Sequence, residues 1–128
     1  LIKCSTRNLR LHGYLPSVAY GQTLSQYGSD ASKILEIMDK QKSMSERIHP
    51  DHPFTKAELE WCVTNEMAMQ VEDILARRSR MLFVDAHAAI ASSEKTARMM
   101  ASLLDRDEQW VQHQIVAFQE LAKGYLPS

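Results

Sequence analysis

The amino-acid sequence predicts an all-α fold, a compact bundle of about five to six helices joined by short connections. The chain of 128 residues contains only four Gly and four Pro, so it lacks the frequent turn residues that an all-β domain needs. Its apolar residues recur at the 3.6-residue spacing of helices that bury one face. Residues that cap or break helices separate these periodic segments, which indicates several short helices within one domain.

The first helical segments are expected between residues 18 and 42. A short helical turn is predicted over residues 18–27 and ends at Gly28. Ser29 or Asp30 then serves as an N-cap, since both side chains accept hydrogen bonds from free backbone amides. The helix that follows extends from Asp30 to about residue 42, and its apolar face consists of Ala31, Ile34, Leu35 and Met38.

A break is predicted over residues 43–53, because the two prolines of His49-Pro50-Asp51-His52-Pro53 cannot continue a helix. Thr55 begins the next helix, which reaches about Met67, and Glu58 completes a capping box. A strand-like alternation is also present in this segment, at Ala57, Leu59, Trp61 and Val63. The capping box and the abundance of Ala, Glu and Leu favour the helix.

The second half of the chain predicts further helices. One covers residues 71–80, and a short apolar run at 81–84 leads into another short helix over 85–90. Ser92 or Ser93 is expected to cap the helix that follows. The buried face of that helix is expected to contain Ala97, Met100, Ala101 and Leu104.

The last helix is predicted to begin at Asp107, whose side chain is a good N-cap. It ends near Gly124, a residue type that suits the left-handed position after a helix. The face that packs on the core is expected to contain Trp110, Val111, Gln114, Ile115, Phe118 and Leu121.

Charge and composition argue against several functional classes. The net charge of −1 lacks the basic surplus of nucleic-acid binders, so no nucleic-acid partner is expected. No apolar run approaches the roughly 20 residues of a membrane-spanning helix, and no secretory leader is recognisable. Cys4 and Cys62 are isolated thiols, which indicate a reducing compartment such as the cytoplasm. Because the chain begins with Leu1, we expect it to be part of a longer protein.

The histidine-rich break is the first candidate site. His49-Pro50-Asp51 matches the tripeptide of J-domain co-chaperones, but the helix before it is not notably basic, so a simple helix break is the favoured interpretation. A zinc site at His49, Asp51 and His52 would need further ligands at recognisable spacing, and none lies nearby; no metal-binding residue is expected. No nucleophile with a base, Gly-rich dinucleotide motif or phosphate loop is present. We therefore expect no catalytic and no cofactor-binding residue in this chain.

The densest polar cluster consists of Asp73, Arg77, Arg78 and Arg80. On a helix, Asp73 and Arg77 lie four residues apart and can form an ion pair. Arginines near a helix C-terminus also interact favourably with the helix dipole. Alternatively, the planar fork of a guanidinium can bind a carboxylate or phosphate of a partner. The structural role is the favoured interpretation, and the partner role stays open.

Parts of the sequence resemble one known family, at residues 27–31 (YGSDA), 57–61 (AELEW) and, most specifically, 72–81 (EDILARRSRM). In this order they are similar to the C-terminal domain of FAD-dependent glycerol-3-phosphate dehydrogenase. Residues 5–14 resemble the segment that leaves the flavin domain in that family. The resemblance implies that residues 1–16 are a linker or docking segment from a preceding flavin domain. Residues 17–128 would then be the helical C-terminal domain.

The resemblance implies an enzyme that oxidises sn-glycerol 3-phosphate to dihydroxyacetone phosphate and passes electrons from FAD to a quinone. FAD and the substrate would bind to the preceding domain, so this chain alone would hold no FAD and would be inactive. The implied partners are the enzyme's own N-terminal FAD and substrate domain and, as a further candidate, a second copy of the enzyme. The expected location is cytoplasmic, and any contact with the inner face of the cell membrane would involve the full-length enzyme.

Two functional questions stay open at this point. We hypothesise that Arg77, Arg78 and Arg80 contact the flavin domain, because charge is densest in the most family-like stretch. A related oxidase branch passes electrons to oxygen, and this domain does not separate the two branches. The alternative function is a stand-alone helical protein-interaction module, which would need an exposed apolar face. A J-type co-chaperone is a third hypothesis.

Overall fold

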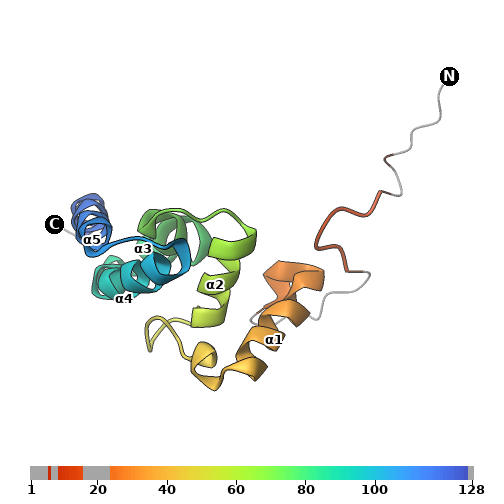
Figure 1. Ribbon diagram of the computed structural model, residues 1–128. Helices are drawn as coiled ribbons and strands as arrows, with labels where there is room; N and C mark the ends of the chain where they lie inside the picture. The colour runs from red at the N-terminus through yellow and green to blue at the C-terminus, as the bar shows by residue number, and fades with distance from the viewer. Residues whose placement is uncertain (1–5, 7–8, 16–23, 127–128) are drawn as a thin grey trace.

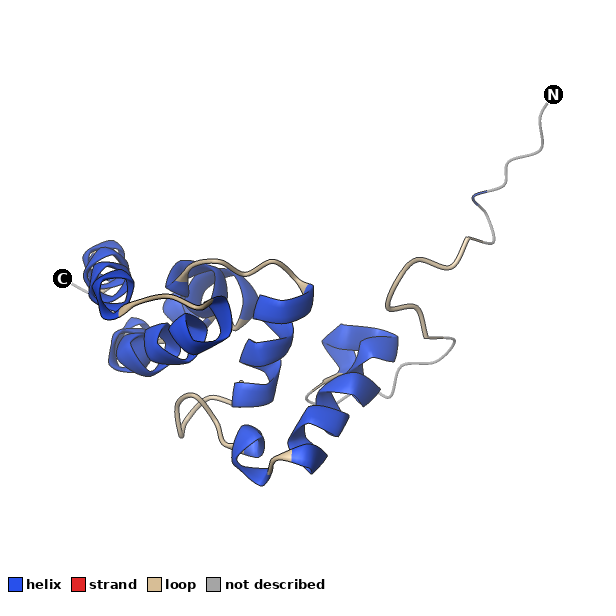
Figure 2. Ribbon diagram, viewed as in Figure 1, coloured by secondary structure: helices blue, strands red, loops and turns tan. Residues whose placement is uncertain are grey.

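The computed structural model describes residues 6, 9–15 and 24–126, and these form an all-helical domain, as predicted. No strand occurs within these ranges, although Arg47 and Thr55 form an isolated β-bridge (Figure 2). The α-helices are α1 (Ala31–Lys40), α2 (Lys56–Asn65), α3 (Met81–Val84), α4 (Ala86–Leu104) and α5 (Glu108–Lys123). Shorter elements are the 3-10 helices η2 (Ser25–Asp30) and η3 (Lys42–Ser45) and the π-helix η4 (Asp73–Arg78).

Helix α2 lies between α1 and the group formed by α3, α4 and α5 (Figure 1). The larger hydrophobic core fills the space between α2 and that group, and its members include Leu59, Ile74, Leu75, Met81, Leu82, Met100 and Phe118. A smaller core joins α1 and η3 to the opposite side of α2, through Ile34, Met44, Ala57 and Trp61. Two cores on opposite sides of one helix leave α2 only a narrow polar stripe, formed by Lys56, Glu60 and Thr64.

The capping box at the start of α2 is confirmed. The Glu58 amide donates to Thr55 Oγ1 at 3.3 Å, and the Thr55 amide donates to Glu58 Oε2 at 2.8 Å. Burial on both sides of α2 also explains the strand-like alternation, because Leu59 and Val63 pack in the larger core, whereas Ala57 and Trp61 pack in the smaller one. The helix ends at Asn65 rather than Met67, since Met67 adopts a φ of 58° that no α-helix accommodates.

The segment before α1 agrees with the prediction in part. Residues 18–23 of the predicted turn lie outside the described residues. The described end of the turn stops at Gly28, as predicted, because the φ of 54° and ψ of −127° of Gly28 are not helical, so η2 consists of two helical pieces on either side of a kink. The chain turns sharply inside η2 because Gly28 has a φ of 54°. Asp30 stands at the N-cap of α1, but its side chain caps no backbone amide. Its carboxylate instead pairs with Lys33 at 3.0 Å and with His12 at 2.6 Å.

Two predictions about the C-terminal half are wrong. Helix α4 runs unbroken from Ala86 to Leu104, because Asp85 already caps it at the Ala88 amide and no helix breaker follows. Ser92 and Ser93 therefore lie inside the helix, buried, and cap nothing. The second error concerns Gly124, whose φ of −67° is right-handed.

The boundaries of the last helix agree with the sequence. Asp107 caps α5, since its carboxylate accepts a hydrogen bond from the Trp110 amide at 2.9 Å. Beyond α5 the chain continues in short-range turns, with the Tyr125 amide bonded to Ala122 O at 3.0 Å, so no left-handed residue is required at Gly124. In the described part of the chain, no helix combines the length and hydrophobicity that crossing a bilayer requires.

Candidate functional site

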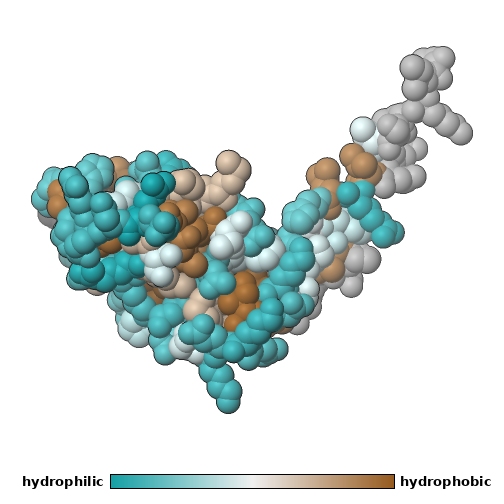
Figure 3. All heavy atoms as spheres, in the orientation of Figure 1, coloured by the Kyte–Doolittle hydropathy of each residue, from teal (hydrophilic) through white to brown (hydrophobic). Residues whose placement is uncertain are grey.

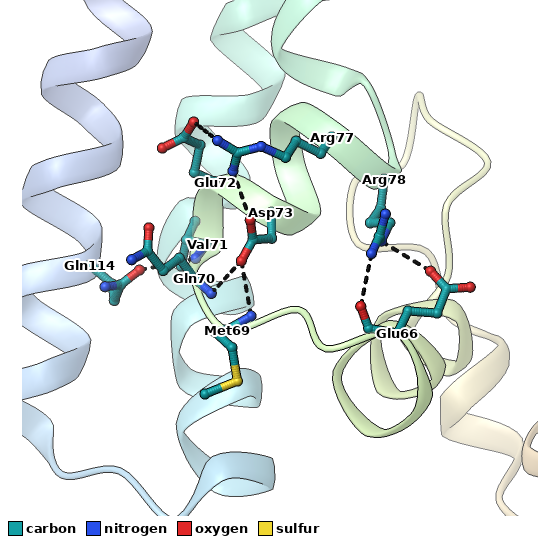
Figure 4. A network of polar contacts seen from close by, with 9 residues as sticks. All are labelled: Glu66, Met69, Gln70, Val71, Glu72, Asp73, Arg77, Arg78 and Gln114. Atoms are coloured by element: carbon teal, nitrogen blue, oxygen red, sulfur yellow. Dashed lines mark hydrogen bonds and ion pairs between the residues drawn. The ribbon is translucent and has the colours of Figure 1, made fainter.

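The arginine-rich segment η4 is held at its start by one carboxylate and one amide. Asp73 Oδ2 accepts hydrogen bonds from the amides of Met69 at 2.9 Å and Gln70 at 3.0 Å (Figure 4). The Val71 amide donates to Gln114 Oε1 of α5 at 3.0 Å, in the buried interior. These bonds satisfy backbone donors that the first turn of a helix leaves free. They therefore position the segment on α5.

This segment was expected to be an α-helix over residues 71–80, and the structure corrects that prediction. Residues Asp73–Arg78 form a π-helix, in which the Ser79 amide bonds to Ile74 O, five residues back, at 2.9 Å. Arg80 then adopts a left-handed conformation with a φ of 58° and a ψ of 13°. The left-handed residue separates η4 from α3, whose residues Met81 and Leu82 lie in the larger core.

Arg77 pairs with carboxylates of its own segment. Its Nη1 lies 2.7 Å from Asp73 Oδ1, which confirms the predicted pair four residues apart, and its Nη2 lies 2.7 Å from Glu72 Oε1. The side chain is 54% exposed, so the contribution of these pairs to stability is within about 1 kcal/mol. The guanidinium of Arg77 is therefore committed within the domain (Figure 4).

Arg78 reaches back to the end of α2. Its Nη2 donates to the carbonyl oxygen of Glu66 at 2.8 Å, and its Nε lies 3.0 Å from Glu66 Oε2 (Figure 4). The bond to the Glu66 carbonyl satisfies an acceptor just past the C-terminus of α2. Arg78 thus ties η4 to α2, a contact that sequence spacing could not reveal.

Arg80 differs from the other two arginines. Its side chain is exposed and has no hydrogen-bond or ion-pair partner within the described ranges. It lines a cavity of about 170 Å³ together with Gln26, His52, Pro53, Phe54, Glu58, Arg78 and Ser79. The structure therefore brings Arg80, the last residue of the arginine block (Arg77, Arg78 and Arg80), beside the histidine-rich turn (residues 49–53), although the two are distant in sequence.

The histidine-rich turn is closed by its own hydrogen bonds and by α4. The Ile48 amide donates to Phe54 O at 2.9 Å, and Lys95 Nζ of α4 donates to Arg47 O at 2.9 Å. His52 Nε2 is buried and lies 3.6 Å from Asp85 Oδ2, beyond hydrogen-bond distance. Among the described residues, no three His, Cys, Asp or Glu side chains are grouped as metal ligands. The turn connects η3 to α2.

A buried titratable cluster lies between η2 and α2, and sequence analysis did not identify it. Glu58 is 1% exposed, and this burial raises the pKa of its carboxyl despite the hydrogen bonds from Thr55. Burial, with a smaller effect of the Glu66 carboxylate, raises the pKa of the Cys62 thiol to about 12. Burial also raises the pKa of the Tyr27 hydroxyl. A buried thiol with a raised pKa is a poor nucleophile, so this cluster belongs to the core.

Three of the cavities between the described residues are small. Their volumes of about 170, 240 and 280 Å³ fall below the roughly 300–1,000 Å³ of cofactor and ligand sites. The largest of these three lies between α1 and α2, and Leu24, Leu35 and Met38 are among the residues that line it. Figure 3 shows hydrophobic surface on this face of the molecule.

Comparison with known proteins identifies the family. Residues 4–111 match the family described as the C-terminal domain of alpha-glycerophosphate oxidase. A mitochondrial glycerol-3-phosphate dehydrogenase of Arabidopsis thaliana is 29% identical over 90 residues, which are 70% of this chain and 14% of that protein. A probable mitochondrial glycerol-3-phosphate dehydrogenase of Dictyostelium discoideum is 29% identical over 120 residues, covering 79% of this chain and 18% of that protein.

The chain thus spans less than a fifth of the length of these relatives. No solved structure matches it. The family match covers η2 to the start of α5, including the arginine-rich segment. The chain therefore belongs to the family of C-terminal domains of alpha-glycerophosphate oxidase.

Proposed function

We propose that this chain is the helical accessory domain of an enzyme that oxidises sn-glycerol 3-phosphate to dihydroxyacetone phosphate. The observation that carries the proposal is the family match over residues 4–111, together with two relatives named as glycerol-3-phosphate dehydrogenases. Because the chain corresponds to a small part of those relatives, the reaction is assigned to the full-length protein. The domain contributes stability and interdomain contacts.

We further propose that the enzyme is FAD-dependent and passes its electrons to a quinone. FAD and substrate are assigned to the part of the protein that precedes this domain, because the cavities described above are too small for a flavin. The family description names an oxidase, whereas both relatives are named dehydrogenases. The names of the relatives favour an acceptor other than oxygen.

The arginine block is the proposed contact with the preceding domain, as the sequence suggested for Arg77, Arg78 and Arg80. Arg77 and Arg78 pair with carboxylates of this domain, so their share in such a contact is secondary. Arg80 is exposed and unpaired in the described structure, which supports it as the main contributor. A second copy of the enzyme is a further proposed partner.

The compartment of the full-length protein is also proposed from the relatives. Both are named mitochondrial, which supports a mitochondrial location in place of the cytoplasmic location that cysteine usage suggested. We propose that the membrane is reached through the full-length enzyme and not through this domain. Fractionation of cells, with an antibody against this domain, tests the assignment.

The reaction is tested with the purified full-length protein. We expect sn-glycerol 3-phosphate to reduce a soluble quinone analogue under nitrogen, with little hydrogen peroxide formed in air. Peroxide formation at the rate of substrate oxidation would place the enzyme in the oxidase branch. Failure to oxidise glycerol phosphate with either acceptor, in protein that retains its flavin absorbance, would refute the proposed reaction.

A stand-alone interaction module is the second candidate. The exposed side chain of Leu35, next to the cavity between α1 and α2, provides the apolar surface that such a module needs. The size of the native gene product discriminates between the two functions. A native protein of this length alone would support the module, and a protein several times longer would support the accessory domain.

A further inference from the structure

We propose that the cavity beside Arg80 is a receptor for one acidic side chain of the preceding domain, and that Arg80 is the residue that binds its carboxylate. This inference rests on the proposed function, since it requires the full-length enzyme. It also narrows the proposed contact from an arginine block to a single guanidinium and a defined cavity. The cavity combines residues of η2, the histidine-rich turn, α2 and η4.

The charges around the cavity leave one cation unbalanced. Arg78 is paired with Glu66 at 3.0 Å, and the buried carboxylate Oε2 of Glu58 accepts from the amide and hydroxyl of Thr55. His52 has Asp85 as its nearest acidic neighbour, at 3.6 Å. Arg80 has no such partner within the described ranges. An anion entering this cavity would therefore meet a guanidinium whose donors are all free.

The backbone at Arg80 gives independent support. A residue with a φ of 58° is best accommodated as glycine, and a long cationic side chain gains nothing from this conformation. Unfavourable backbone geometry is often found where a side chain must point to a particular place. At Arg80 this geometry occurs at a residue that lines the cavity.

The size of the cavity indicates what it accepts. About 170 Å³ is too small for a cofactor or a drug-sized ligand, but it suits a single side chain. The fork of a guanidinium matches the two oxygens of a carboxylate, and such pairs are strong when they are shielded from water. Because the family consists of C-terminal domains, another part of the same protein is available to supply Asp or Glu.

The test uses the full-length protein and zero-length carbodiimide coupling, which joins a lysine amine to a carboxylate in direct contact. We expect the Arg80→Lys variant to form a cross-link from position 80 to an Asp or Glu outside this chain, identified by mass spectrometry. Arg106→Lys is the matched control, because the side chain of Arg106 is also exposed and makes no hydrogen bond or ion pair within the described residues. We expect no such cross-link from position 106.

Charge reversal provides the second measurement. Arg80→Glu should raise amide exchange around residues 78–84 of the full-length protein roughly tenfold, and reversing the identified partner to lysine should restore it. Arg106→Glu should leave exchange in this segment unchanged. Cross-links from position 80 to Glu58 or Glu66 alone, no cross-link at all, or equal exchange in the two reversal variants would overturn the proposal. If the wild-type protein fails to oxidise glycerol phosphate, the proposed function fails, and the cross-link still decides the docking site.

Discussion

Gly28 and Gly13 cross so closely that a β-carbon at Gly28 would lie 1.8 Å from the carbonyl oxygen of Gly13. The crossing is fixed by a hydrogen bond from the Ser29 amide to the same carbonyl oxygen, at 3.1 Å. Both glycines have positive φ angles, of 54° and 81°, which glycine adopts without steric cost. The segment that carries Gly13 is thereby attached to the start of the helical domain, next to the ion pair of His12 and Asp30.

Gly28→Ala should therefore detach this segment. The added methyl group cannot be accommodated without moving the backbone, so we expect a loss of about 1–3 kcal/mol in the free energy of unfolding and faster exchange of the Ser29 amide. Gly13→Ala is the matched control, because its β-carbon would meet Tyr27 O at an ordinary 3.7 Å. It should cost less, through its positive φ alone. Equal effects of the two substitutions would show that the crossing does not hold the segment.

Glu58 should make stability depend on pH. Burial raises the pKa of its carboxyl above the ordinary value of 4.5, so the folded protein holds this proton more tightly than the unfolded chain. Its contribution to stability is complete below pH 4.5 and is lost as the pH rises through the folded pKa. Glu58→Gln keeps the capping box and cannot ionise.

The measurement is urea unfolding of both proteins from pH 4 to pH 8. We expect the difference in unfolding free energy, wild type minus Glu58→Gln, to fall as the pH rises. Comparing the two proteins removes the opposite effects of Asp30, Asp85 and Glu46, whose folded pKa values are lowered by their hydrogen bonds. A difference that rises with pH would mean that the Thr55 hydrogen bonds outweigh burial.

The elements that local signals determine could be predicted from sequence. Thr55 with Glu58, and Asp107 before its helix, start helices because a cap acts within three residues along the chain. The pair of Asp73 and Arg77 is likewise set by helical spacing. The all-α class follows from the 3.6-residue spacing of the apolar residues. This spacing shows that a helix buries one face, and it does not depend on which element covers that face.

The features that depend on contacts across the chain could not be predicted. The π-helix and the left-handed Arg80 end a segment whose start is fixed by Gln114, 43 residues away. Arg78 finds its acceptor 12 residues away at Glu66, and the cavity beside Arg80 needs residues from η2 and the histidine-rich turn. Spacing along one helix carries no information about such partners. The site was therefore identified from sequence as a block of charges, without its geometry.

Ser92 and Ser93 give a matched test of the unbroken helix α4. Both are buried, but Ser93 Oγ donates to Ile90 O at 2.7 Å, whereas Ser92 Oγ has no partner within the described residues. Because a buried hydroxyl without a partner is destabilising, Ser92→Ala should be neutral or raise the unfolding free energy by up to about 1 kcal/mol. Ser93→Ala should lower it by about 1 kcal/mol. Thermal unfolding of the two variants measures these changes in stability. A lower unfolding free energy of Ser92→Ala would instead indicate that Ser92 has a capping role.

Asp105 ends α4 in the left-handed conformation, with a φ of 53°, while the Arg106 amide bonds to Ala101 O at 2.9 Å. This is the backbone that a C-terminal glycine adopts without steric cost, so Asp105→Gly should stabilise the domain by about 0.5–1 kcal/mol, and Asp105→Ala should destabilise it. Urea unfolding at neutral pH measures both.

Arg80 has the same left-handed backbone, so Arg80→Gly should stabilise the domain by a similar amount only if the side chain of Arg80 makes no stabilising contact. In the full-length enzyme we expect that gain to be offset by the lost carboxylate contact, and an undiminished gain there would argue against Arg80 as a docking residue.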